Sequence, residues 1–83
     1  LMAQITVLFF ASLRDEIGAD KIKLNAEDVD DLMSQLKDRF GEKKVQVLRG
    51  KNIRIAVNKE LIDRSFEFVG NEEVAFLPPV TGG

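Results

Sequence analysis

The chain has 83 residues, about half of the common domain size of about 100–150 residues, so we expect one small domain. Twelve Lys and Arg against 14 Asp and Glu give a net charge of -2 with no basic block, which argues against nucleic-acid binding. The sequence has no Cys and no His, which excludes disulfides, thiolate nucleophiles, zinc-finger sites and imidazole acid–base catalysis.

No apolar run approaches the length of about 20 residues that a membrane-spanning helix needs, so we expect no contact with a membrane. The apolar segment at residues 4–10 is too short and wrongly flanked for a secretory signal peptide. We therefore expect the protein in the cytoplasm.

The first predicted element is a central β-strand over residues 4–10, because this run is rich in β-branched and aromatic residues. Alternation places Ile5, Val7 and Phe9 on one face of the strand. Leu8 and Phe10 fall on the other face, so we expect both faces to be covered.

A short helical turn is predicted next, since Ser12 stands three residues before Asp15 in a variant of the capping box and Gly18 provides a stop. Residues 21–24 alternate polar and apolar side chains, which predicts a half-buried strand. This strand can return antiparallel beside the first.

The strongest helix signal is one apolar stripe. Its members are Val29, Leu32, Met33, Leu36 and Phe40. We expect Asp28 or Asn25 to cap this helix and Gly41 to end it. The acidic residues at its start, within residues 27–31, complement the positive end of the helix dipole. A carboxylate metal site is the alternative interpretation of the same residues.

Lys43, Lys44 and the stretch around residues 50–52 are predicted to lie in loops, and residues 53–57 to form a strand. The lysines and Arg54 are interpreted as a solvated rim, with contact to a partner or an anion as the alternative. Asn58 and Lys59 then suggest a tight turn before a very short return strand. Phe66 and Phe68 are expected to fill the core from a loop. Turn residues at 70–73 precede the final strand at 74–77.

This order of elements predicts an α+β domain over residues 1–77, with one main helix packed across a small mixed sheet and a short extra helical turn. The arrangement fits the β-grasp fold. A single helix stripe covers only one face of such a sheet, and an uncovered apolar face marks a surface for a partner.

The tail after the last strand, residues 78–83, carries the functional information. Its sequence is Pro78, Pro79, Val80, Thr81, Gly82 and Gly83. The prolines favour an extended backbone and the glycines leave a thin, pliable tip, so the segment can reach about 20 Å. Two terminal glycines arise by chance in about one of 200 chains, although a frayed terminus is the simplest alternative.

A terminal carboxylate is a poor electrophile until its oxygen becomes a leaving group, as after adenylation from ATP. The sequence offers no Cys or His to perform such a step. We therefore expect carrier chemistry at Gly83, with activation and delivery catalysed by partner proteins.

Residues 74–83, with Ala75, Phe76, Leu77 and the Pro-Pro step before the glycines, closely resemble the small, sulfur-carrying subunit of molybdopterin synthase, a ubiquitin-like β-grasp family. Residues 7–11, the turn that ends at Gly18 and residues 56–58 also resemble this family, so the similarity covers nearly the whole chain. Leu77 departs from the pattern, because a second aromatic residue is common there.

The resemblance implies that Gly83 is adenylated by a ubiquitin-activating-type adenylyltransferase and converted to a thiocarboxylate. ATP is then used by that enzyme, and the chain binds no cofactor or metal of its own. The tail, Pro78 to Gly82, would enter the large subunit of the synthase, whose residues transfer sulfur to a pterin precursor for the molybdenum cofactor. Phe76 and Leu77 would belong to the docking surface, in an assembly of two small and two large subunits.

Two alternatives share the Gly-Gly ending. One is another β-grasp sulfur carrier, such as that of the thiamine pathway, although the Pro-Pro step and the Phe9-Phe10 pair argue against it. The other is a ubiquitin-like protein modifier or a plain interaction domain.

Overall fold

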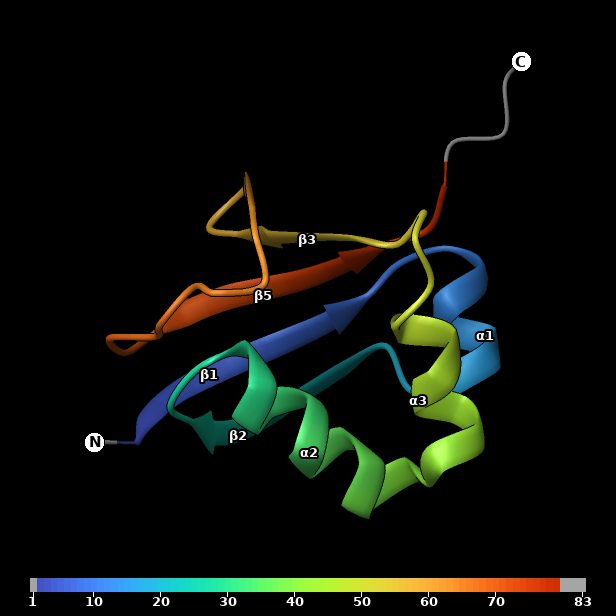
Figure 1. The fold of residues 1–83 in the computed structure, drawn as a ribbon, viewed down its shortest axis with the longest axis horizontal. Helices are drawn as coiled ribbons and strands as arrows, with labels where there is room; N and C mark the ends of the chain where they lie inside the picture. The colour runs from blue at the N-terminus through green and yellow to red at the C-terminus, as the bar shows by residue number, and fades with distance from the viewer. Residues whose placement is uncertain (1, 80–83) are drawn as a thin grey trace.

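Two strands from opposite ends of the chain, β1 (Ala3–Phe9) and β5 (Glu72–Leu77), lie side by side in the middle of the sheet (Figure 1). They pair in parallel, with Phe9 opposite Phe76. The computed structural model describes residues 2–79, and within them β2 (Lys21–Ala26), β3 (Arg54–Val57) and β4 (Glu60–Ile62) complete a mixed sheet in the order β2-β1-β5-β3-β4. The sheet therefore joins the start and the end of the chain.

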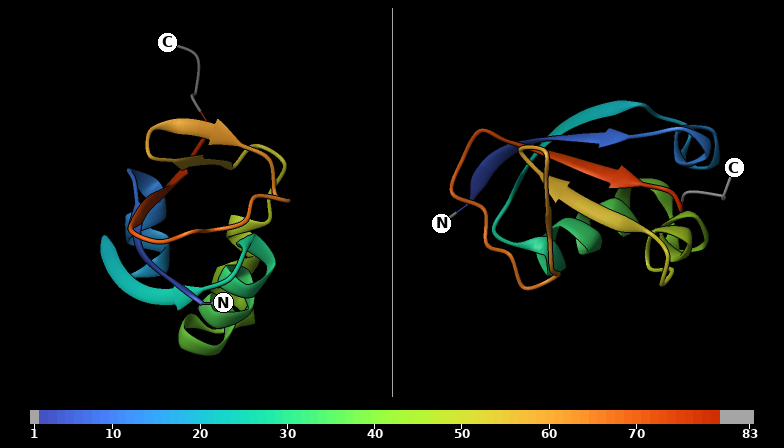
Figure 2. Two further views of the ribbon diagram at one scale, coloured as in Figure 1. Left: turned by 90° about the vertical axis from the view of Figure 1, so that its left-hand side faces the viewer. Right: turned by 90° about the horizontal axis from the view of Figure 1, so that it is seen from above.

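Helices α2 (Val29–Phe40) and α3 (Glu42–Leu48) pack on one side of this sheet, and α1 (Ser12–Ile17) lies at one end of it (Figures 1 and 2). The opposite face of the sheet carries no helix among the described residues (Figure 2). The α+β, β-grasp architecture predicted from the sequence is confirmed.

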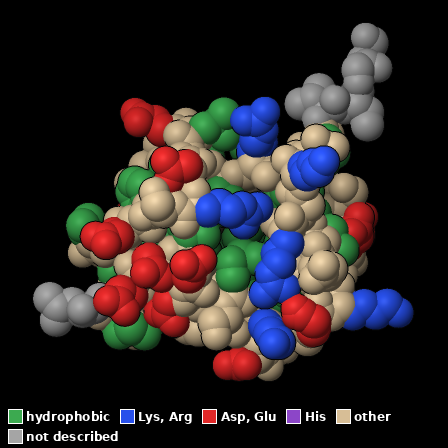
Figure 3. All heavy atoms as spheres, viewed as in Figure 1, with side chains coloured by type: hydrophobic (Ala, Val, Ile, Leu, Met, Phe, Trp, Pro, Cys, Tyr) green, Lys and Arg blue, Asp and Glu red, His purple; other side chains and the backbone are tan. Residues whose placement is uncertain are grey.

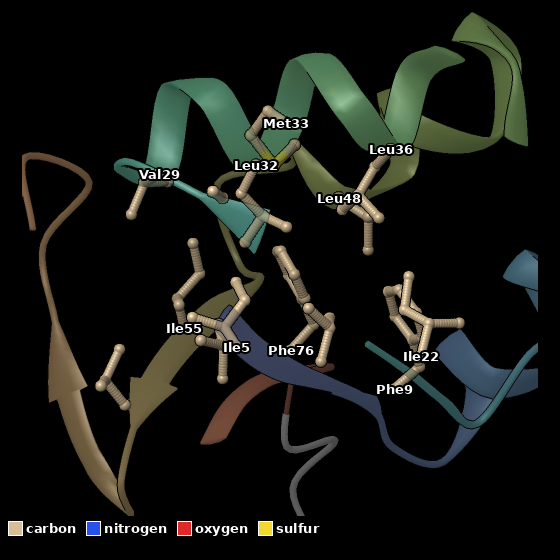
Figure 4. Close-up of a cluster of buried hydrophobic side chains, with 14 of the residues drawn as sticks. Ile5, Phe9, Ile22, Val29, Leu32, Met33, Leu36, Leu48, Ile55 and Phe76 are labelled. Atoms are coloured by element: carbon tan, nitrogen blue, oxygen red, sulfur yellow. The ribbon is translucent and has the colours of Figure 1, made fainter. Parts of the chain in front are cut away.

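The core lies between the sheet and these helices (Figure 4). Phe9 stacks on Phe76 with ring centroids 5.6 Å apart, and the edge of Phe40 meets Phe9 at 6.2 Å. Leu32 and Leu36 reach this layer from α2, and both are fully buried. The aromatic pair thus ties the two central strands to the main helix.

The apolar stripe of α2 behaves as predicted, and the helix begins and ends where its capping residues indicated. The Asp28 carboxylate accepts a 2.8 Å hydrogen bond from the Asp31 backbone N–H, and Gly41 follows the last helical residue. Asn25, the other candidate cap, lies in β2 instead. The turn at Asn58 and Lys59 is also confirmed, since both have positive φ between β3 and β4.

Helix α3 was not predicted, because its lysines were interpreted as part of a loop. Lys43 and Lys44 are exposed, but Val45 and Leu48 are fully buried three residues apart on one face of the helix. The sequence predicted one main helix and a short extra helical turn, and α3 is a further helix that this prediction lacked.

Two further details differ from the sequence prediction. Ser12 lies inside α1 and makes no capping bond, because Ala11 occupies the N-cap position with φ of 51°. The strand β1 is covered on one face only: Leu8 is half-buried and Phe10 exposed. No described helix is long and apolar enough to cross a membrane.

Candidate functional site

The base of the tail lies where β5 ends at Leu77, at the end of the sheet beside α1 (Figure 1). Pro78 is half-buried and Pro79 exposed. Proline has no backbone N–H, so the ladder of sheet hydrogen bonds cannot continue through these two residues. The rest of the expected carrier segment, Val80, Thr81, Gly82 and Gly83, lies outside the described residues.

An apolar row crosses the open face of the sheet next to this base. The sheet register places Leu8 opposite Ala75, Ala75 opposite Ala56, and Ala56 opposite Leu61. Leu77 extends the row toward the tail, and Phe10 follows β1 directly, with its backbone N–H bound to the Phe76 carbonyl at 3.3 Å. We call this set the outer patch. It consists of Leu8, Phe10, Ala56, Leu61, Ala75 and Leu77.

The outer patch contains two of the large apolar side chains that are most open to water. Phe10 is 45% exposed and Leu61 is 61% exposed. Large apolar side chains gathered on one face are costly to leave in water, so such a face is typical of a protein-binding surface.

A hollow of about 440 Å³ joins the outer patch to the tail. Its walls are Asn52, Arg54, Leu61, Leu77, Pro78 and Pro79. Three of the residues expected at the site, Leu77, Pro78 and Pro79, therefore come together with a cationic side chain and an apolar one. This arrangement suits a partner that holds the tail by its base.

Phe76 does not belong to this surface. Its side chain has 0% exposure and lies stacked on Phe9 in the core. Because neighbouring residues of a strand face opposite sides, Phe76 points inward and Leu77 outward. The expectation that Phe76 contacts a partner is therefore wrong for its side chain.

Phe10 and Leu61 are exposed surface residues that the sequence did not indicate. A covered face was predicted for Phe10, and Leu61 lies in the short return strand, for which no surface role was predicted. The alternation of Ile5, Val7 and Phe9 on the core side was a usable signal, since it leaves Phe10 on the side that the helices do not cover.

The acidic residues at the start of α2 have structural partners. Asp28 binds the Asp31 backbone, and the Asp31 carboxylate accepts a 2.9 Å hydrogen bond from the Glu27 N–H. Within residues 2–79, no three acidic side chains are grouped so as to hold a metal ion. The described residues thus support the capping interpretation of this cluster.

The chain is similar to known proteins in sequence and in fold. The model of the ThiS family matches residues 7–83. A molybdopterin synthase sulfur carrier subunit of Haemophilus influenzae is 36% identical, over 95% of this chain and 99% of the relative.

Two solved structures share the fold at 27% identity. Small archaeal modifier protein 1 of Methanosarcina acetivorans has a TM-score of 0.83 and covers 100% of this chain and 99% of its own. A protein–protein complex of subunits 1 and 2 of molybdopterin-converting factor from Helicobacter pylori contains a chain with a TM-score of 0.72, covering 96% of this chain and 99% of its own.

The family resemblance read from residues 74–83 is therefore confirmed across nearly the full length of the protein. Its β-grasp sheet, the match over residues 7–83 and the identity to a curated relative lead to one assignment. This chain belongs to the ThiS family.

Proposed function

We propose that this protein is the sulfur-carrier subunit of a molybdopterin synthase, and that Gly83 is its reactive residue. The observation that carries the proposal is the hollow beside Pro78 and Pro79, which adjoins an uncovered apolar sheet face at the base of a Gly-Gly tail. The curated relatives named as sulfur carrier subunits of this enzyme support the same role.

In this proposal the chain carries the reacting group and its partners catalyse the reactions. The Gly83 carboxylate attacks the α-phosphate of ATP on a ubiquitin-activating-type adenylyltransferase, and pyrophosphate leaves. A sulfur nucleophile then displaces AMP and leaves a thiocarboxylate. ATP is thus a substrate of the partner enzyme, and the expected compartment is the cytoplasm.

Sulfur delivery requires a second partner, the large subunit of the synthase. The outer patch docks on that subunit, Leu77 and the hollow fix the base of the tail, and Pro78 to Gly82 lead the thiocarboxylate to the pterin precursor. The residues that catalyse the transfer belong to the large subunit, in an assembly with two copies of each chain. The complex of subunits 1 and 2 from Helicobacter pylori supports the existence of such a pairing in the family.

Intact mass spectrometry tests the loading step. After incubation with ATP, a sulfur donor and the adenylating enzyme, the chain should gain about 16 Da, the difference between sulfur and oxygen, at Gly83. Deleting Gly83 or adding one residue after it should abolish the gain. Lys43→Gln, which changes an exposed residue of α3 that does not line the hollow at the tail, serves as the control and should load normally.

A protein modifier is the second candidate, because the Methanosarcina acetivorans structure of the same fold is named a modifier protein. An experiment with the chain in its thiocarboxylate form distinguishes a sulfur carrier from a protein modifier. Mixed with the large subunit and the pterin precursor, a sulfur carrier returns to its carboxylate mass. Covalent conjugates to lysines of other proteins, without pterin product, would instead favour the modifier and contradict the synthase role.

A further inference from the structure

A second hollow lies on the helical side of the sheet, between α2 and the segment from α3 to Arg64. Its volume is about 470 Å³. Val29 and Met33 contribute its apolar part, and Lys37, Arg49 and Arg64 contribute three cations. No residue lines both this hollow and the one beside Pro78. We call it the α2 groove, and its use does not depend on the proposed function.

The floor of the α2 groove is apolar. Val29 is fully buried and Met33 is 7% exposed, and both come from the start of α2. In Figure 3, hydrophobic side chains lie at the centre of this face with Lys and Arg side chains beside them. A methionine adapts its shape easily, which suits a floor that must fit an apolar side chain of a ligand.

Two of the cations are held in place by their own contacts. Arg49 pairs with Glu42 at 2.5 Å, and the Arg64 guanidinium donates to the Leu48 carbonyl at 3.0 Å. Each of these contacts occupies one terminal nitrogen, while a guanidinium carries further N–H donors in a rigid fork. Arg64 can therefore bind a carboxylate at a reduced cost in conformational entropy, whereas at Arg49 an incoming carboxylate shares the guanidinium with the Glu42 carboxylate.

The remaining lining residues, Asp30 and Ser34, favour a carboxylate ligand over a phosphate ligand. The Asp30 side chain lines the same groove and would repel a multiply charged phosphate group, whereas Ser34 adds a neutral hydroxyl. A peptide meets all of these groups at once: its carboxylates pair with the cations, its backbone N–H groups donate to Asp30, and an apolar side chain covers Met33.

We propose that the α2 groove is a docking site for an acidic peptide segment of a partner protein, with carboxylates bound by Arg49 and Arg64 and an apolar side chain on Met33. Since the groove shares no residue with the hollow at the tail, a partner bound here leaves the tail and the outer patch accessible. The chain could then be held by one protein at the α2 groove while another protein contacts the outer patch.

The test is an NMR titration of the full ¹⁵N-labelled chain with a capped hexapeptide, acetyl-Asp-Glu-Leu-Phe-Glu-Gly-amide. Amide shifts should concentrate at Met33, Ser34, Arg49 and Arg64, with a dissociation constant of about 0.1–1 mM. Raising the ionic strength should weaken binding, because exposed ion pairs are screened. The same peptide with Asn and Gln in place of its acidic residues should bind at least about tenfold more weakly.

A pair of matched variants locates the site. Lys37→Gln combined with Arg49→Gln should reduce affinity by about tenfold or more, because two of the three cations are lost. Lys43→Gln combined with Lys51→Gln removes the same charge from exposed residues outside the groove and should change affinity by less than about twofold.

Several results would overturn the proposal. These are equal binding of the neutral peptide, equal losses in the two double variants, shifts centred on the outer patch, or no shift at about 5 mM peptide. Tripolyphosphate that displaces the peptide and binds more tightly would replace the peptide site with a phosphate site.

Discussion

At the residue scale, the neighbours Phe76 and Leu77 have opposite surroundings, and this makes their substitutions separable. Phe76 is buried against Phe9, whereas Leu77 lies on the outer patch. Phe76→Ala should lower the free energy of unfolding by about 3–5 kcal/mol through the cavity it leaves. Leu77→Ala should cost about 1 kcal/mol or less, since its side chain is only half-buried.

Urea unfolding measures the stability difference, and binding to the synthase large subunit gives the second readout. Leu77→Ala should weaken that binding while the chain stays folded. If both variants lost stability equally, the assignment of Leu77 to an outward-facing surface would be contradicted.

The Asp63 carboxyl has a lowered pKa. The Ser65 hydroxyl, and then the Ser65 backbone N–H, donate to its carboxylate and hold the pKa below the usual Asp value. Ser65→Ala removes the larger cause, so the pKa of Asp63 should rise toward the ordinary value of about 4. Carbon-detected NMR titration of the carboxyl group measures it.

The sign of the linked stability follows from the lowered pKa. The stabilising contribution of the Asp63 carboxylate is present above the ordinary Asp pKa of about 4. It is lost as the pH falls through the lower pKa of Asp63 in the folded protein. Ser65→Ala should therefore change stability only above that range, and only slightly, because the carboxyl is exposed. An unchanged pKa in Ser65→Ala would exclude the hydroxyl as the cause.

At the scale of elements, the start of α2 depends on Asp28. Its carboxylate satisfies the Asp31 N–H, a donor that has no partner within the helix. Asp28→Ala should therefore cost about 1 kcal/mol of unfolding free energy, as measured by urea denaturation. Asp38→Ala, an exposed acid in the last turns of the same helix, is the matched control and should change stability by less than about 0.5 kcal/mol.

Helices α2 and α3 show how far local patterns predict an element. In α2 the stripe from Val29 to Phe40 repeats over three turns, so the period was visible in the sequence. Helix α3 is only 7 residues long and buries two apolar side chains of its own, Val45 and Leu48, which is too few for a period to emerge. Its stability comes from packing on the core, which no local window contains.

At the scale of the whole molecule, the uncovered sheet face and the base of the tail form one surface. Phe10→Glu combined with Leu61→Glu should abolish binding to the large subunit by placing charges in an apolar contact. Both side chains are substantially exposed, so the melting temperature should change little. Isothermal titration calorimetry measures the loss of binding.

The control exploits two other exposed apolar residues. Met2→Glu combined with Val69→Glu makes the same chemical change at residues outside the outer patch. That variant should bind the large subunit normally. Equal losses in the two double variants would show that added negative charge, rather than the outer patch, decides binding.

The main helix and the turn at Asn58 could be predicted from the sequence because their signals are local. The stripe of α2 and the turn at Asn58 each depend on residues close together in the chain, whereas the expectation for Gly82 and Gly83 lies outside the described residues. The stripe sets a helix period and the turn residues favour positive φ, both without reference to distant residues.

Only the tertiary structure decided which faces are covered. The parallel pairing of β1 with β5 joins residues nearly a chain length apart, and it places Phe76 in the core while Leu8, Leu61 and Leu77 remain on the open face. The α2 groove likewise combines side chains from three separate segments. Burial depends on what packs against a residue in space, so the local sequence determined the main helix and the turn at Asn58, while long-range pairing determined which apolar side chains are left exposed.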